Sequence, residues 1–150
     1  MEDMLEVGRG ILAAQGFSRL MKAELIRWSG ELTEFRVPLS EDTNQHLGMA
    51  HGGVICYAAD NALTFAGAAA LGSRVITAEL KVNYIRPAIG SALVARATAL
   101  NAGRTQAVVR CDVFVVGEDG VSEKLCAAAL GTVRKREDRP ADAVAAGETR

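Results

Sequence analysis

Residues 51–72 read HGGVICYAADNALTFAGAAALG, and this stretch decides the fold. From Val54 to Leu71 nearly every residue is apolar or small, and Asp60 is the only charged one. A surface helix normally shows a single apolar stripe, so a helix that is apolar all round is expected to be buried on all sides. A membrane span is disfavoured, because an aspartate at its centre would cost about 2.5–3.5 kcal/mol. The stretch therefore predicts one long core helix.

The segments on both sides of this helix predict strands. Before it, a short amphipathic helix is expected to end near Gly16, and two strands are expected at about residues 21–28 and 32–39. After Gly72, alternation with a period of two predicts a strand whose apolar face consists of Ile76, Ala78, Leu80, Val82 and Tyr84. Three more strands are expected at about residues 92–100, 109–115 and 125–133.

The order of these elements predicts the fold class. An antiparallel sheet has one face to cover, and a single apolar helix is available to cover it. We therefore predict an α+β fold in which a curved antiparallel sheet wraps around one long central helix. Residues 1–133 are expected to form one domain, which includes the N-terminal helix in residues 1–16. Residues 134–150 are charged and then rich in Ala, Asp and Gly, which predicts a flexible tail.

The overall composition narrows the possible functions. The 150 residues include 17 Lys and Arg against 18 Asp and Glu, so the positive excess that nucleic-acid binding requires is missing. The three cysteines, Cys56, Cys111 and Cys126, lie far apart and form no CxxC pair, which argues against a zinc ribbon and a disulfide framework. The acidic start Met-Glu-Asp-Met lacks the features of a signal peptide. We therefore expect a cytoplasmic protein that binds neither nucleic acid nor membrane.

Asp60 is the first candidate for a functional role, because a buried carboxylate is costly unless it is paired or hydrogen-bonded. Helical spacing places it on a stripe of small or polar residues formed with Gly53, Cys56, Thr64 and Gly67. Such a stripe lets a ligand or a second helix approach closely, and the sequence leaves both possibilities open. Thr64, four residues after Asp60, is expected to hydrogen-bond Asp60 and orient it. Cys56 lacks a neighbouring general base, so we expect it to be a small buried hydrophobe.

His51, Gly52 and Gly53 form the second candidate, at the start of the same helix. The first N–H groups of a helix have no partner within it and favour an anion or a developing oxyanion. Together with a carboxylate about two turns later, this pattern suggests acyl transfer, whereas the glycine pair alone is equally typical of a plain loop-to-helix turn. Gln45 and His46 precede it in a loop. No Asp, Glu or Cys at ligand spacing accompanies the histidines, so we expect no metal site.

These residues resemble a known family. The run Gln45–Gly53, followed by Asp60 nine residues after His51, is similar to the hotdog-fold acyl-CoA thioesterases, in the branch of the phenylacetate-pathway and hydroxybenzoyl-CoA enzymes. Residues 83–88 and 101–105 resemble a strand and a turn of that family, and the likeness covers about residues 20–133. It implies a hotdog fold and a homodimer or homotetramer. It also implies active sites at the dimer interface, with the acid from one subunit and the loop and helix start from the other.

The resemblance also implies roles for single residues. Asp60 would act as the nucleophile or as a general base on water, and the sequence does not decide between the two. Gly52, with Gly53 beside it, would supply the oxyanion-hole amide. Gln45 would bind the thioester carbonyl or position water, and His51 would assist the leaving thiolate.

The resemblance further implies which residues contact the carboxylate of Asp60, the thioester carbonyl and the CoA moiety. Thr64 and Thr77 both match hydroxyls that members of the family use, and Thr64 is preferred because its direction on the helix is known. Many members have Asn at the position of Gln45, so a shift by one residue would give that role to Asn44 instead. The expected CoA-binding residues, of which the arginines would pair with phosphates, are Asn83, Arg86 and Arg104.

The sequence thus predicts an acyl-CoA thioesterase that acts on a small aryl or medium-chain acyl-CoA. No cofactor is expected, because CoA is part of the substrate. Three other functions stay open: a non-catalytic acyl-CoA-binding or regulatory module on the same fold, a hydratase or dehydratase of that fold, and a structural protein whose stripe packs another helix. The hydratases use a His/acid pair with a different spacing, which this sequence does not contain.

Overall fold

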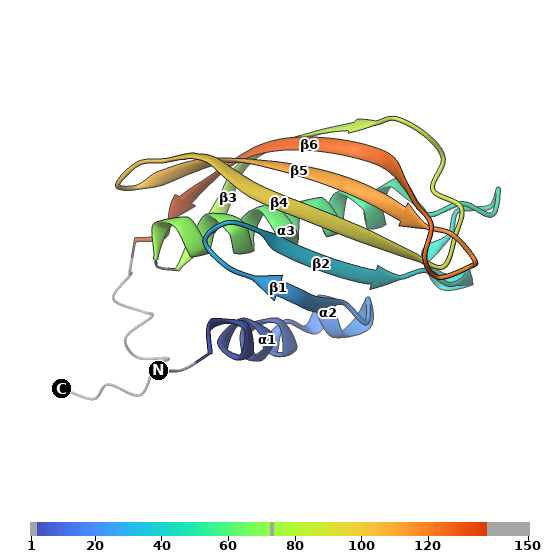
Figure 1. Ribbon diagram of the computed structural model, residues 1–150, viewed down its shortest axis with the longest axis horizontal. Coiled ribbons are helices and arrows are strands. Elements are labelled where there is room, and N and C mark those ends of the chain that lie inside the picture. Colours follow the sequence, from blue (N-terminus) through green and yellow to red (C-terminus); the bar gives the residue numbers. More distant parts are fainter. Residues whose placement is uncertain (1–2, 73, 138–150) are drawn as a thin grey trace.

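The computed structural model describes residues 3–72 and 74–137. The chain begins with two helices, alternates strands and helices, and ends with four successive strands, of which the last three form a meander (Figure 1). The elements are α1 (Met4–Ala14), α2 (Gly16–Leu20), β1 (Glu24–Trp28), β2 (Thr33–Pro38), the short helix η1 (Glu41–Thr43), α3 (Gly52–Leu71), β3 (Val75–Tyr84), β4 (Ala92–Ala102), β5 (Gln106–Val116) and β6 (Glu123–Lys135).

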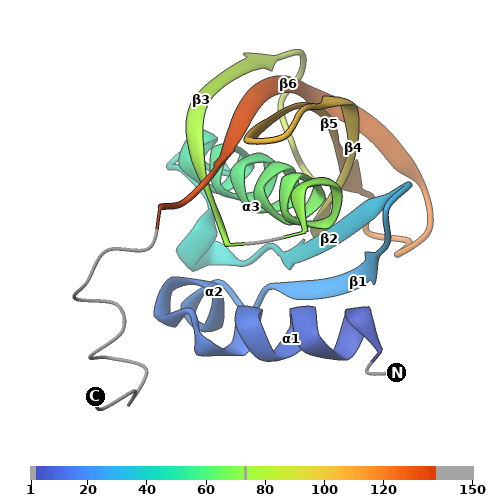
Figure 2. The ribbon, with the colours of Figure 1, turned by 90° about the vertical axis from the view of Figure 1, so that its left-hand side faces the viewer.

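The strands form one six-stranded sheet in the order β1-β2-β4-β5-β6-β3, and every neighbouring pair is antiparallel. Viewed along α3, the sheet curls around that helix, and α1 lies against the edge strand β1 (Figure 2). The predicted α+β fold with one central helix is therefore confirmed. The two edge strands, β1 and β3, lie on opposite sides of α3.

The small residues of α3 allow the sheet to pack closely on it. Ala58, Ala62 and Leu63 are fully buried. A Cβ atom on Gly67 would lie 2.6 Å from Val133 of β6, so glycine is required there. Gly67 therefore packs against the sheet and does not continue the stripe of Asp60. Although α3 is long and apolar enough to cross a membrane, 56% of its apolar window is buried inside this fold, and packing accounts for its composition.

The opposite face of α3 corrects the expectation of burial on all sides. Cys56, Asp60 and Thr64 are only partly covered in the single chain. This face lies beside the edge strand β3, away from β4 and β5. The helix therefore has a packed side and a half-open side, and the candidate carboxylate belongs to the half-open one.

Strand β3 departs from its predicted alternation. A β-bulge shifts the β3–β6 register between Thr77 and Glu79. Before the bulge Thr77 faces inward and Ile76 is 45% exposed, whereas after it Leu80 and Val82 face inward as predicted. A bulge inserts one extra residue and reverses the faces of the residues before it. The predicted inward positions of Ile76 and Ala78, both of which are exposed, are therefore wrong.

The sequence pattern did not predict the two short helices α2 and η1, and strand β6 ends later than predicted. Helix α2 is too short to show a periodicity, and it is held by tertiary contacts: the hydroxyl of Tyr57 donates to Oγ of Ser18 over 2.8 Å, and Ser18 donates to Gln15. Helix η1 is a single turn. Strand β6 continues to Lys135, so the first residues of the expected tail belong to the sheet. Residues 138–150 of that tail lie outside the described part.

Candidate active site

The carboxylate of Asp60 is held by a hydroxyl from the neighbouring strand. Oγ1 of Thr77 donates to Oδ1 of Asp60 over 2.7 Å. Oγ1 of Thr64 donates to the backbone carbonyl of Asp60 over 2.7 Å and lies 2.8 Å from Oγ1 of Thr77. The single proton of Thr64 can serve the carbonyl or Thr77, but not both at once. Thr77 thus orients one carboxylate oxygen of Asp60, whereas Thr64 contacts the main chain of Asp60 and the hydroxyl of Thr77.

This arrangement corrects the preference for Thr64 over Thr77. Thr64 bonds the main chain because a threonine within a helix readily donates to the carbonyl four residues earlier. Thr77 reaches the carboxylate because the bulge turns it toward α3. The strict alternation of the sequence hides this, since it places Thr77 on the same face as Glu79.

Among the described residues, Asp60 forms no ion pair. Within residues 3–72 and 74–137, no Lys, Arg or His pairs with Asp60, and no hydrogen bond reaches its Oδ2. Burial raises the pKa of the neighbouring Cys56 thiol, and the negative charge of Asp60 raises it further. Cys56 is therefore a protonated thiol near neutral pH, a poor nucleophile. Oδ2 of Asp60 therefore has no hydrogen-bond partner among the described residues and is available to a substrate or a water molecule.

His51 caps the start of α3 and fixes which amide is free. Its Nδ1 accepts the N–H of Gly53 over 2.9 Å, so in the neutral ring the proton sits on Nε2, which is a donor. The N–H of Gly53 is therefore used inside the loop. The N–H of Gly52 has no acceptor in the described part of the chain. Of the two predicted oxyanion amides, the geometry leaves only that of Gly52 available.

Tyr84, at the end of β3, contacts the start of α3, and the sequence does not predict this contact. Its hydroxyl donates to the carbonyl of Gly52 over 3.1 Å and so braces the first turn of α3. Burial raises the pKa of Tyr84, which keeps this donor protonated. A Cβ atom on Gly52 would lie 3.4 Å from the Tyr84 hydroxyl, an ordinary contact. Packing within this chain therefore does not require glycine at position 52, in contrast to Gly67.

The loop before α3 separates the roles of Gln45 and Asn44. Oε1 of Gln45 accepts the N–H of Leu47 over 3.2 Å, which anchors the side chain by its oxygen and leaves the amide NH2 as a donor. Oδ1 of Asn44 is buried without a hydrogen-bond partner among the described residues. A carbonyl must be bound by a donor, so the geometry favours Gln45 for that role. The loop is tied down where the N–H of Ala50 donates to the carbonyl of Ala88 over 2.9 Å.

The amide and the carboxylate do not meet in one chain. Gly52 and Asp60 are eight residues apart on α3, which at 1.5 Å per residue is about 12 Å along the axis. One reacting carbonyl needs its oxyanion donor and its attacking atom each at about 3 Å. Within one subunit, the Gly52 amide and the Asp60 carboxylate therefore cannot act on the same carbonyl. We refer to Asp60, and to Gly52 with its loop, as two candidate half-sites.

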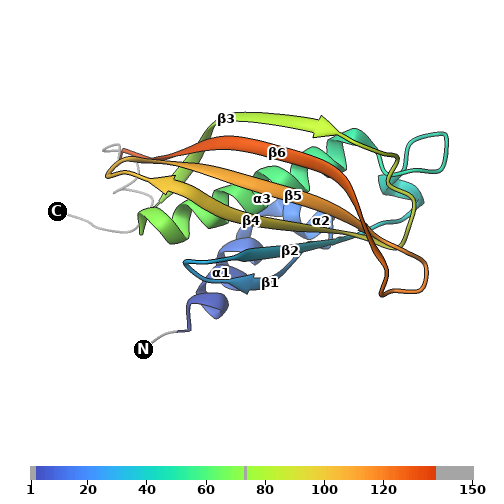
Figure 3. The ribbon, with the colours of Figure 1, turned by 45° about the horizontal axis from the view of Figure 1, so that its top comes forward.

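The expected CoA-binding residues are also spread out. Asn83 and Arg86 lie at and just beyond the end of β3, while Arg104 lies in the β4–β5 turn at the other end of the sheet (Figure 3). All three are exposed. One subunit therefore does not bring Arg86 and Arg104 to the same phosphate.

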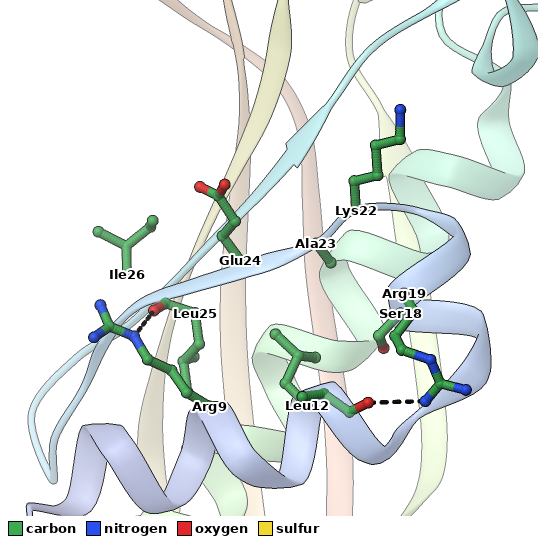
Figure 4. A pocket seen from close by; sticks show the side chains of 10 residues that line it. Arg9, Leu12, Ser18, Arg19, Lys22, Ala23, Glu24, Leu25 and Ile26 are labelled. Carbon is green, nitrogen blue, oxygen red and sulfur yellow. Dashed lines mark hydrogen bonds between the residues drawn. The ribbon is translucent and has the colours of Figure 1, made fainter.

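Two cavities flank the N-terminal helices. The smaller, about 380 Å³, lies between α1, α2 and β1, and its basic side chains do not converge: Arg9 donates to the carbonyl of Leu25 and Arg19 to that of Ala13 (Figure 4). The larger, about 640 Å³, begins at Thr64 and follows the C-terminal half of α3. No group of three or more His, Cys, Asp or Glu in the described ranges could hold a metal ion.

Comparison with known proteins identifies the family. Residues 47–121 match the model of the thioesterase superfamily. A Deinococcus radiodurans protein to which esterase activity is ascribed is 36% identical over 126 residues, which are 83% of this chain and 82% of that protein. A Haemophilus influenzae thioesterase structure (26% identity, TM-score 0.75) covers 89% of this chain and 91% of its own.

A second structure, a thioesterase family protein of Silicibacter pomeroyi, has 25% identity and a TM-score of 0.75, over 84% of this chain and 93% of its own. The Escherichia coli PaaI protein from the phenylacetic acid degradation operon shares the fold at 16% identity, with a TM-score of 0.75 over 88% and 92% of the two chains. The residues matched by the family model include Gly52, Asp60 and Thr77. The chain belongs to the thioesterase superfamily and is a thioester hydrolase.

Proposed function

We propose that the protein hydrolyses acyl-CoA thioesters and that Asp60 is the catalytic carboxylate. The observation that carries this proposal is the state of Asp60: a hydroxyl orients one oxygen, and no cation neutralises the other in the described chain. A thioester carbonyl has little resonance stabilisation, so a well-placed carboxylate and a polarised carbonyl are sufficient for its cleavage.

Two routes use the same geometry. As a nucleophile, the free Asp60 oxygen bonds to the thioester carbon, the carbon–sulfur bond breaks with its electron pair on sulfur, and water then hydrolyses the anhydride. As a general base, Asp60 takes a proton from a water molecule while the water oxygen attacks the same carbon. In both routes the Nε2–H of His51 donates a hydrogen bond to the departing thiolate. The thiolate then takes up the proton that the water molecule releases, to give CoA.

The carbonyl oxygen is bound by the other half-site. The N–H of Gly52 points out of the N-terminus of α3, where the helix dipole favours the negative charge that develops on that oxygen. The side-chain NH2 of Gln45 supplies a second donor. These groups act on the carbonyl that faces the Asp60 of another subunit, because their own Asp60 lies about 12 Å away along the helix.

A homodimer is therefore part of the proposal. Strand β3 is an edge strand, so one row of its backbone N–H and C=O groups faces no other strand among the described residues. Three large apolar side chains beside it, Ile76, Tyr84 and Ile85, are exposed. The half-open face of α3 adjoins this edge. Pairing of two β3 edges would cover these groups and bring the half-site of one subunit to the Asp60 of the other.

The test is release of CoA thiol from a panel of aromatic and straight-chain acyl-CoAs. The wild type is expected to turn over at least one of them, and Asp60→Asn to be at least about 100-fold slower, a typical loss for a catalytic acid or base. Asp112→Asn is the matched control, since Asp112 is also partly buried but is paired with Arg110 on the sheet. Equal rates for the wild type and Asp60→Asn would refute the role of Asp60. CoA binding without any turnover would instead indicate a non-catalytic binding module.

A further inference from the structure

The larger cavity begins at Thr64, one helical turn beyond the candidate carboxylate Asp60. Its inner end is the side chain of Thr64, which touches Thr77, and Thr77 in turn holds Asp60. From there it runs along α3 past Phe65 to Gly72. Thr64 and Gly72 are eight positions apart, which corresponds to about 12 Å along the helix axis. The cavity therefore lies about one helical turn from Asp60 and extends away from it toward the C-terminal end of α3.

The walls of this cavity are mainly apolar and come from four elements. Helix α3 supplies Phe65, Ala68 and Ala69, and the start of β3 supplies Val75 and Ile76. The volume of about 640 Å³ is in the range of small-molecule sites. An elongated apolar space suits a hydrocarbon chain, which gains about 0.8 kcal/mol for each buried CH2 group.

The far wall is formed by α1 and by Trp28 of β1. Met4 and Ile11, seven residues apart and thus on one face of α1, both line the cavity and are 38% and 49% exposed. Trp28 is held rigidly, because its Nε1–H donates to the carbonyl of Phe65 over 2.7 Å and its ring packs edge-on against the Phe65 ring at 5.4 Å. The helix thus presents large apolar side chains to a space that nothing in the described chain fills.

We propose that this cavity binds the straight hydrocarbon chain of the acyl group, and that Met4, Ile11 and Trp28 set the length of chain accepted. The proposal rests on the proposed acyl-CoA hydrolysis and deepens it. It favours straight chains of medium length over aryl groups, which would leave the end of the cavity at α1 empty. Arg74 and Arg136 also line the cavity, and guanidinium groups pair with phosphates, so CoA itself is the competing occupant that the experiment must separate.

The direct test uses Trp28, the only tryptophan of the chain, as a reporter of occupancy. Decanoate, added to the wild type below its micelle concentration, is expected to cause a saturable change in Trp28 emission, while free CoA causes none. This readout does not depend on catalysis, so it stands even if Asp60 is not the catalytic group. A response to CoA but not to decanoate, or to neither, would overturn the proposal.

A second test fills the cavity from α1. Ile11→Phe is expected to lower kcat/KM for decanoyl-CoA by about tenfold relative to that for butyryl-CoA, since a pocket discriminates by roughly this factor for small changes in apolar fit. Leu20→Phe is the matched control, because Leu20 is exposed on α2 and lines neither cavity. An unchanged chain-length preference in Ile11→Phe, with catalysis still dependent on Asp60, would refute this proposal and leave the proposed function intact.

Discussion

Two carboxylates of this protein, Asp60 on the half-open face of α3 and Glu123 on the outer face of the sheet, are held in opposite ways. Both oxygens of Glu123 accept from Arg96, over 2.6 and 2.9 Å, and Arg96 also donates to Glu34 over 2.7 Å. The Arg96 guanidinium lies 5.1 Å from the centre of the Phe114 ring. Asp60 has one neutral donor, Thr77, and one oxygen without a partner in the described chain.

The difference shows which carboxylate can do chemistry. A guanidinium that binds both oxygens neutralises the charge and occupies the lone pairs, so Glu123 joins strands and does nothing else. A single hydroxyl orients Asp60 and leaves it a charge and a lone pair for a substrate. The same chain therefore contains a structural and a candidate catalytic carboxylate, distinguished by their donors.

The largest expected effect concerns how the two half-sites combine. Asp60→Asn and Gln45→Ala homodimers are each expected to be nearly inactive, whereas an equimolar mixture refolded together recovers about a quarter of wild-type activity. Half of the dimers in such a mixture are mixed, and one of the two sites in each of these has both halves intact, as expected for a two-fold interface. No recovery would mean that each site is built within one subunit, which would contradict the proposed dimer.

The next effect separates the two threonines. Thr77→Val keeps the shape of the side chain but removes the donor to the carboxylate, and a hydrogen bond to a charged group contributes about 1.5–3 kcal/mol. We expect kcat to fall by roughly tenfold or more. Thr64→Val removes a bond to a main-chain carbonyl and is expected to affect kcat less. Steady-state kinetics of both variants decide this, and a larger loss in Thr64→Val would reverse the roles derived from the geometry.

Glu123 should affect stability and not catalysis. Arg96 holds the pKa of Glu123 below its usual range, chiefly through the hydrogen bond. A lowered pKa in the folded state adds stability at neutral pH, and this stability is lost as the pH falls below about 4.5 and through the folded-state value. Because the pair is partly exposed, Glu123→Gln is expected to cost only about 0.2–1 kcal/mol at pH 7. Urea unfolding at pH 7 and pH 3 measures this, and the difference between the two proteins should shrink at pH 3.

The smallest effect makes Cys56 a reporter of the charge on Asp60. Burial is the main cause of its raised pKa, and the charge of Asp60 is the second. In Asp60→Asn the second cause disappears, so alkylation of Cys56 should begin at a lower pH than in the wild type. Glu123→Gln serves as the control, with an unchanged pH profile. An identical profile in all three proteins would place the Asp60 charge too far from Cys56 to match the structure.

The sequence by itself determined the central helix and the composition of both half-sites. The apolar run of residues 54–71 predicts a helix covered by a sheet, and the period of two predicts the strand that follows it. His51, Gly52 and Asp60 were predicted from adjacency and helical spacing, because both are local properties of the chain.

Only the tertiary structure decided which groups touch. The bulge in β3 turns Thr77 toward Asp60, and no periodicity of the sequence encodes such an inserted residue. The cavity wall is equally inaccessible to sequence reasoning, since Met4, Trp28 and Phe65 lie far apart along the chain and meet through packing. Spacing along one helix was local and therefore predictable, whereas contacts between a helix, an edge strand and an N-terminal helix depend on how all three pack around one core.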